Sequence, residues 1–155
     1  FKILIMNSIF KRIGFFSCIA FCFMNILCED MDDAVDDVDA LCDEVTIINQ
    51  GIYDNLVSDG FQFTAVTITD DCLNVTIAAS GCGGDTWEMK LVDSGAVAES
   101  LPEQRYLKFQ LINKEICLAF VGQTVSFDLK PLQVEGSNKI VLNIEGLQES
   151  VTYSY

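Results

Sequence analysis

Apolar residues recur at every second position through most of the chain after residue 72. This alternation predicts strands with one face in a core and the other toward solvent. Glycines and two prolines stand between the alternating runs, as turn residues do. The apolar positions are Leu73, Val75, Ile77 and Ala79; Trp87, Met89 and Leu91; Leu107, Phe109 and Leu111; Val125, Phe127 and Leu129; Ile140, Leu142 and Ile144; and Val151, Tyr153 and Tyr155.

Two further apolar segments, 45–48 and 61–69, complete the set of expected strands. Asp70 and Asp71 would form a tight hairpin turn after the second of them, and residues 135–138 form another clear turn signal. No segment has the 3.6-residue period of a confident helix. We therefore predict an all-β fold, an antiparallel β-sandwich of immunoglobulin-like architecture with about 7–8 strands.

The first 28 residues have a different pattern. Lys11 and Arg12 precede a mostly apolar run from Ile13 to Leu27, and no acidic residue occurs before Glu29. A membrane-spanning helix needs roughly 20 apolar residues, so this shorter run is more typical of a secretory signal peptide. We expect residues 1–28 to be a signal helix, with an uncleaved membrane anchor as the alternative.

Residues 29–41 are strongly acidic and contain no basic residue. Carboxylates at this density repel one another, so we expect an extended, solvated tether between the leader and a single domain at 42–155. Calcium binding is the alternative, but the segment has neither the spacing nor the glycine of an EF-hand loop.

Cys28 stands at the end of the apolar run, directly before the acidic segment. This arrangement resembles uncharacterised short bacterial surface lipoproteins, and Asp71 to Leu73, Gly81 to Lys90 and Gln104 to Tyr106 carry the resemblance into the domain. The resemblance implies a lipid on Cys28 and a location outside the cytoplasm, at the bacterial outer membrane or cell surface. It implies no known activity.

Four cysteines lie in the segment 42–155, namely Cys42, Cys72, Cys82 and Cys117. In an oxidising compartment they would form two disulfides, for which three connectivities are possible. We favour Cys42 with Cys72, which would pin the start of the domain to a strand, and Cys82 with Cys117, which would tie a glycine loop to a distant segment. A zinc site is a weaker alternative, because the chain has no C-x-x-C spacing and no histidine.

Charge narrows the choice of partners. The net charge is −14, and without the leader six basic residues face 23 acidic ones, which gives −17. Such acidity argues against a nucleic-acid partner and favours a cationic protein or a cell-surface component. The membrane is a further expected partner, which the chain would contact through a lipid anchor or the leader.

The sequence gives little support for a catalytic function. The absence of histidine excludes Ser-His and Cys-His arrangements, and we expect no enzymatic activity, no metal and no cofactor. Asp70 with Asp71, and Asp85 with Glu88, are acid pairs beside turns and are expected to be solvated. The glycine loop 81–84 is followed by a strand, so we interpret it as a disulfide-pinned turn and not as a phosphate site.

The sequence therefore favours a non-enzymatic exported domain that binds a partner or serves a structural role. The first alternative is an inhibitor or immunity-type protein that docks a cationic hydrolase through an acidic face or the loop 102–105. A remote alternative is a small glycan hydrolase, which would need two acids facing one cleft. Arg105 is expected to pair with a nearby carboxylate, and Trp87 to lie in the core.

Overall fold

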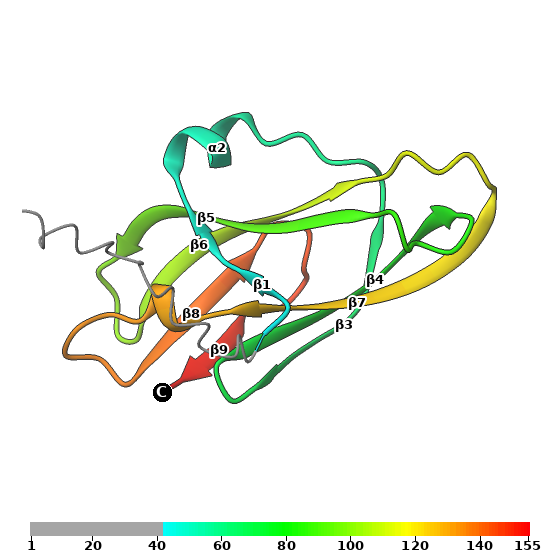
Figure 1. Cartoon of the computed structure of the whole chain (residues 1–155). Coiled ribbons are helices and arrows are strands. Elements are labelled where there is room, and N and C mark those ends of the chain that lie inside the picture. Colours follow the sequence, from blue (N-terminus) through cyan, green and yellow to red (C-terminus); the bar gives the residue numbers. More distant parts are fainter. Residues whose placement is uncertain (1–41) are drawn as a thin grey trace, which may run out of the picture. The chain divides into compact units, whose positions relative to one another are not determined.

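The computed structural model describes residues 42–155, and the predictions for the signal helix, Cys28 and the acidic tether fall outside this range. Two mixed sheets pack against each other, with strand orders β1-β7-β4-β3 and β2-β5-β6-β8-β9 (Figure 1). The predicted all-β fold is confirmed. Within 42–155 no helix has the length and apolar character needed to cross a membrane.

The elements have these bounds: β1 (Glu44–Val45), β2 (Ile47–Ile48), α2 (Gln50–Asn55), β3 (Gln62–Thr69), β4 (Cys72–Gly81), β5 (Glu88–Ala98), β6 (Glu103–Ile112), β7 (Ala119–Asp128), the 3-10 helix η1 (Lys130–Leu132), β8 (Lys139–Ile144) and β9 (Val151–Ser154).

The alternating positions of the sequence form the core between the sheets. Leu73, Leu107, Phe127 and Leu142 are fully buried, and Trp87 is 8% exposed, as expected for a core tryptophan. Aromatic rings at the centre meet edge to face: the Phe127 and Phe109 centroids lie 5.9 Å apart. Burial of alternate residues from both sheets stabilises the sandwich, since apolar area removed from water is the main favourable contribution to folding.

The strand directions differ in part from the predicted antiparallel arrangement. Four of the strand pairs are antiparallel, but β1 with β7, β2 with β5, and β6 with β8 are parallel. Each parallel pair joins segments that are not consecutive in the chain. Alternation along one strand shows which face is buried and does not show which strand lies beside it, so the sequence could not reveal these pairs.

Residues 44–48 pass from one sheet to the other. β1 pairs with the end of β7 at Phe127 and Asp128, and β2 pairs with β5 at Val92 and Asp93. Between them, Thr46 is buried, and its hydroxyl donates to the Asp128 carbonyl at 2.7 Å. The segment predicted as one strand is thus two short strands that close one side of the sandwich.

A short helix, α2, was not predicted from the sequence. None of its six residues is buried, so it leaves no apolar period of 3.6 residues to detect. Its local signal is Asn49, the N-cap residue, whose side-chain oxygen accepts from the Ile52 N–H at 2.9 Å.

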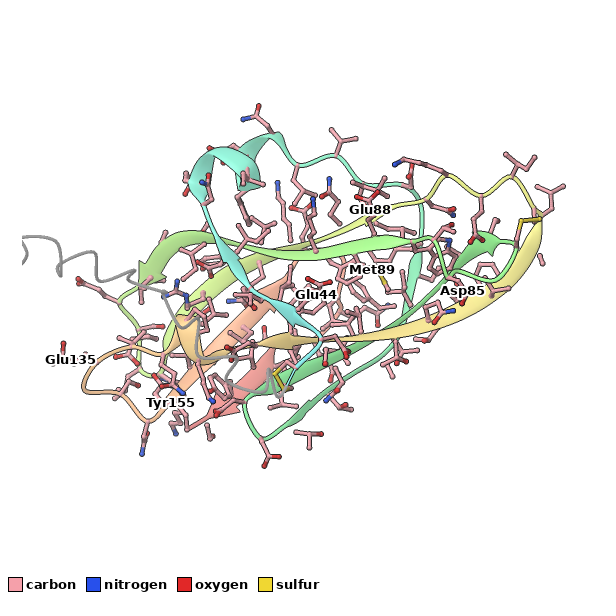
Figure 2. All side chains as sticks on the ribbon, in the orientation of Figure 1. Glu44, Asp85, Glu88, Met89, Glu135 and Tyr155 are labelled. Atoms are coloured by element: carbon pink, nitrogen blue, oxygen red, sulfur yellow. A yellow bond between two sulfur atoms is a disulfide. The ribbon has the colours of Figure 1, made fainter. Side chains whose placement is uncertain are left out.

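Disulfides pin β4 at both ends. Cys42 bonds to Cys72, the first residue of β4, and Cys82, directly after its last residue, bonds to Cys117. Figure 2 shows the two bonds in yellow at opposite ends of the sheet. This is the connectivity favoured from the sequence. The predicted hairpin before β4 is also present, with Asp70 in the left-handed region at φ 53°.

One ion pair lies within the core. Asp93 is fully buried and Arg105 is 6% exposed. The guanidinium makes two hydrogen bonds to the carboxylate, Nη2 to Oδ1 at 2.8 Å and Nε to Oδ2 at 3.1 Å, and the Gly95 N–H also donates to Asp93. The expectation that Arg105 pairs with a carboxylate is confirmed.

Candidate binding groove

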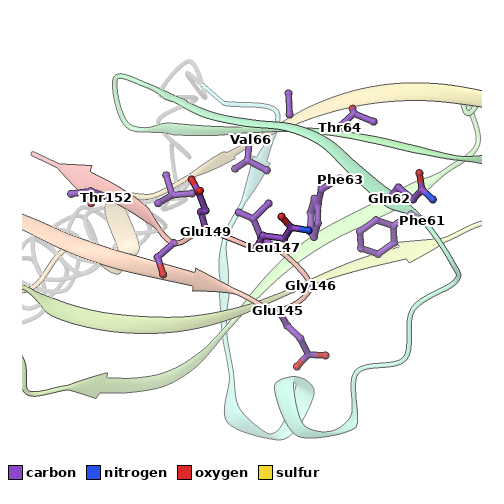
Figure 3. A pocket seen from close by; sticks show the side chains of 14 residues that line it. Phe61, Gln62, Phe63, Thr64, Val66, Glu145, Gly146, Leu147, Glu149 and Thr152 are labelled. Atoms are coloured by element: carbon purple, nitrogen blue, oxygen red, sulfur yellow. The ribbon is translucent and has the colours of Figure 1, made fainter.

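A groove opens between the free edges of the two sheets. β3 ends the first sheet and β9 ends the second, and both lie at the opposite end of the strand order from β1 and β2. The groove has a volume of about 980 Å³ and is lined by residues 61–66 on one side and 145–152 on the other (Figure 3). A cavity of this volume lies at the upper end of the range typical of ligand sites.

The floor of the groove is apolar. Phe61, Phe63, Val66, Leu147 and Val151 line it, and each is half-buried and packs against the core cluster. Phe61 and Phe63 meet edge to face, with ring centroids 5.0 Å apart. These side chains therefore present apolar surface to whatever enters the groove.

A β-bulge shapes the wall formed by β3. The pairing of β3 with β4 shifts between Phe63 and Ala65, which leaves Thr64 as the extra residue. Because of the bulge, Phe61 and Phe63 face the core side before it, and Val66 and Ile68 do so after it. On the opposite wall, Gly146 adopts φ +85°, a conformation that favours glycine, where the chain turns from β8 toward Leu147.

The polar rim of the groove is acidic. Glu145 and Glu149 are exposed, and the lining residues include no lysine or arginine. Outside the lining, the Lys108 ammonium lies 3.6 Å from the Glu145 carboxylate, while no ion pair engages Glu149 within the described part of the chain. The groove thus combines an apolar floor with a net negative rim.

The sequence did not single out these residues. Its available signal was the pair Phe61 and Phe63 at the start of a segment, 61–69, that carries no charged residue in a strongly charged chain. The opposite wall could not be found in the same way, because nothing local predicts that residues 145–152 lie across from β3.

The acid pairs named from the sequence lie outside the groove, and one member of each pair contacts another side chain there. Asp71 accepts a hydrogen bond from the Tyr153 hydroxyl at 2.5 Å, and Glu88 lies 3.2 Å from the Lys114 ammonium. Desolvation, followed by the bond to Asp71, raises the pKa of Tyr153 to about 12. Neither Asp70 with Asp71 nor Asp85 with Glu88 lines the groove (Figure 2 labels Asp85 and Glu88).

Most of the segment suggested for docking, 102–105, is strand and not loop. β6 begins at Glu103, and the Arg105 side chain is buried against Asp93. Alternation places Arg105 on the same face of β6 as Leu107, so its side chain points into the core. Leu101, two residues before β6, is 96% exposed.

The glycine loop holds the chain's own carboxylate. Glu115 accepts hydrogen bonds from the backbone N–H groups of Cys82, Gly83 and Gly84 and from the Thr86 hydroxyl. These bonds, led by that from Gly83, lower the pKa of Glu115 to about 2. The backbone N–H groups that such a loop can offer to an anion are therefore engaged by Glu115.

Gly81 has no room for a side chain beside this carboxylate. A Cβ at Gly81 would lie 2.5 Å from Glu115 Oε2 and 3.0 Å from the Trp87 ring. Together with the Cys82–Cys117 disulfide, the Glu115 contacts fix the segment before β7, on which Ile116 and Leu118 are each 93% exposed. The loop therefore serves to hold a projecting part of the chain in place.

Acid is expected to remove the contribution of Glu115 to stability. Its pKa is lower in the folded state than the ordinary 4.5, so the contribution is complete above pH 4.5 and is lost as the pH falls toward about 2. We expect Glu115→Gln to lower the melting temperature at pH 7 and the gap to wild type to narrow toward pH 2. Calorimetry across this range tests it, with exposed Glu135→Gln as the control. A gap that does not change with pH would contradict the assignment.

Within residues 42–155, no group of three or more potential metal-ligating His, Cys, Asp or Glu side chains lies together.

No protein-family model matches the chain, and no curated protein matches it. Solved structures do. A protein of unknown function (DUF1344) from Bacteroides vulgatus is similar with a TM-score of 0.50 and 20% identity, over 72% of this chain and 56% of that one. The likeness shows the fold.

A second similar structure is a NigD-like immunity protein from Bacteroides caccae, with a TM-score of 0.48 and 12% identity, over 70% of this chain and 58% of that one. The chain thus spans less than two thirds of the length of either solved structure.

Proposed function

We propose that this chain is an exported, non-enzymatic binding domain, anchored at the outer membrane or cell surface by a lipid on Cys28, that holds a polypeptide partner in the groove between β3 and β9. The observation that carries the proposal is the groove itself, which exposes Phe61, Phe63 and Leu147 between two open sheet edges. Exposed apolar surface rimmed by polar residues is typical of protein interaction sites.

The two disulfides support export, because such bonds form and persist mainly in oxidising compartments. The intact mass of protein from the membrane fraction tests the anchor, before and after reduction and alkylation. We expect a diacyl or triacyl mass on a chain that begins at Cys28, with two bridges that open on reduction. An unlipidated chain would refute the anchor and leave the groove proposal standing.

Site-specific photo-crosslinking tests the groove. A photoreactive residue at Gln148, which is exposed in the groove wall, is expected to capture a defined polypeptide in cells that export the full chain. The same residue at Glu135, exposed outside the groove, is the matched control and should not capture it. Equal capture at both positions, or none at Gln148, would overturn the proposed binding role.

An inhibitor or immunity-type role is the second candidate, and the acidic rim at Glu145 and Glu149 favours it because a cationic hydrolase would be attracted there. Sequencing the captured polypeptide distinguishes this role from general surface binding. If the partner is a basic hydrolase, adding the purified domain should lower its activity, and Glu149→Lys should weaken that inhibition.

A further inference from the structure

We infer that the groove takes an extended, cationic segment of its partner as an added strand along β3. This inference rests on the proposed function and names the chemistry of the partner at the same site. The segment would alternate apolar residues, which face the floor of the groove, with lysine or arginine residues near its acidic rim.

The first support is that β3 is an open edge. β4 pairs with β3 on one side only, so alternate backbone N–H and C=O groups of β3 face outward. Edge strands are usually protected by charged side chains, proline or β-bulges; β3 and β9 have no charged residue and no proline, and β3 has only the bulge at Thr64. An edge without charged residues or proline can still serve as a template for pairing with another chain.

The second support is a precedent within the fold. On the other side of the sandwich, residues 44–48 add β1 to the edge of one sheet and β2 to the edge of the other. No described segment does this on the groove side, where β3 and β9 are both terminal strands. An added segment would complete that side in the way that residues 44–48 complete the first.

The third support is the match of spacing and apolar surface. Residues in a strand point alternately to opposite faces, so every second residue of an added segment would face the same way as Phe61 and Phe63. Those rings and Leu147 form the half-buried floor. Apolar residues at alternate positions of the partner would bury this surface.

Charge selects among possible occupants. Glu149, which makes no ion pair within residues 42–155, favours lysine and arginine at the rim, whereas Glu145 already pairs with Lys108; no basic lining residue opposes a cationic partner. The chain's own segment 29–41 contains acidic residues and no basic ones, so like charges would repel it. A second copy is also disfavoured, since its β3 carries no basic residue and its net charge is strongly negative.

The test uses a blocked peptide of alternating valine and lysine, roughly eight residues long so as to span residues 61–66. We expect it to bind the purified domain and to slow amide hydrogen exchange in β3. The matched peptide of alternating valine and glutamate should not bind. Glu149→Lys is expected to weaken binding of the lysine peptide about fivefold, while exposed Glu135→Lys leaves it unchanged.

N-methylation of the peptide distinguishes strand pairing from simple apolar contact. Only one edge of an added strand pairs with β3, so methylating alternate amides in one phase should abolish binding, whereas methylation in the other phase should be tolerated. Equal binding by both methylated peptides, or no binding of the lysine peptide at all, would overturn the strand-addition inference. Crosslinking at Gln148 without strand pairing would refute this inference alone, whereas absence of the crosslink would refute the proposed function.

Discussion

Replacing Arg105 with methionine is expected to lower the free energy of unfolding by about 3–5 kcal/mol, because it leaves the carboxylate of Asp93 buried without its countercharge. Asp93 has no exposed surface, and within residues 42–155 the only other hydrogen bond to its side chain comes from the Gly95 N–H at 2.6 Å. A single backbone donor does not compensate for the lost guanidinium. Urea denaturation followed by circular dichroism measures the change.

The double variant Asp93→Asn with Arg105→Met is the control for this prediction. It removes both charges, and the asparagine oxygen can still accept from Gly95. Since removing both members of a buried ion pair costs much less than removing one, we expect it to recover most of the lost stability. Equal losses in the single and double variants would show that packing, and not the unpaired charge, accounts for the effect.

Removing either disulfide is expected to lower the free energy of unfolding by about 3–4 kcal/mol, since each closes a loop with a sequence separation of 30 residues or more in the unfolded chain. The sequence separations are 30 residues for Cys42–Cys72 and 35 for Cys82–Cys117. Because these loops do not overlap, the two losses should add. Their sum is of the same order as the whole stability of a typical domain, so reduction of both should leave the domain largely unfolded.

Paired cysteine-to-serine variants test this, one for each bond, with denaturant titrations under oxidising and reducing conditions. Each variant should lose the stability of its own bond and respond to reductant only through the other. The variant that lacks both bonds serves as the control and should not respond to reductant. An unchanged denaturation midpoint in either pair would contradict a stabilising role for that bond.

Much of the fold could be predicted because its main signal is local. A strand with one buried face alternates along its own length, so Leu73, Leu107 and Leu142 were recognisable as core residues without knowledge of their neighbours. Strand order and direction depend on contacts between distant segments. β6 and β8 pair in parallel although β7, which lies between them in the sequence, belongs to the other sheet. This pairing therefore left no signal in the apolar pattern.

The buried ion pair had a signal that the apolar pattern obscured. Asp93 follows Leu91 by two residues, and Arg105 precedes Leu107 by two, so both occupy core-facing positions of their strands. A charged residue in phase with a buried run indicates a partner on the neighbouring strand. The groove had a weaker signal, since its two walls come from segments about 80 residues apart in the chain.

The disulfide between Cys42 and Cys72 also determines how mechanical load would enter the domain. β1 and β2 have two residues each, and a pull on the chain before Cys42 would strip strands so short one hydrogen bond at a time. The covalent bond instead passes tension to the first residue of β4, a strand flanked by β3 and by a ten-residue ladder with β7. Force applied before Cys42 would thus be borne by a strand in the middle of a sheet.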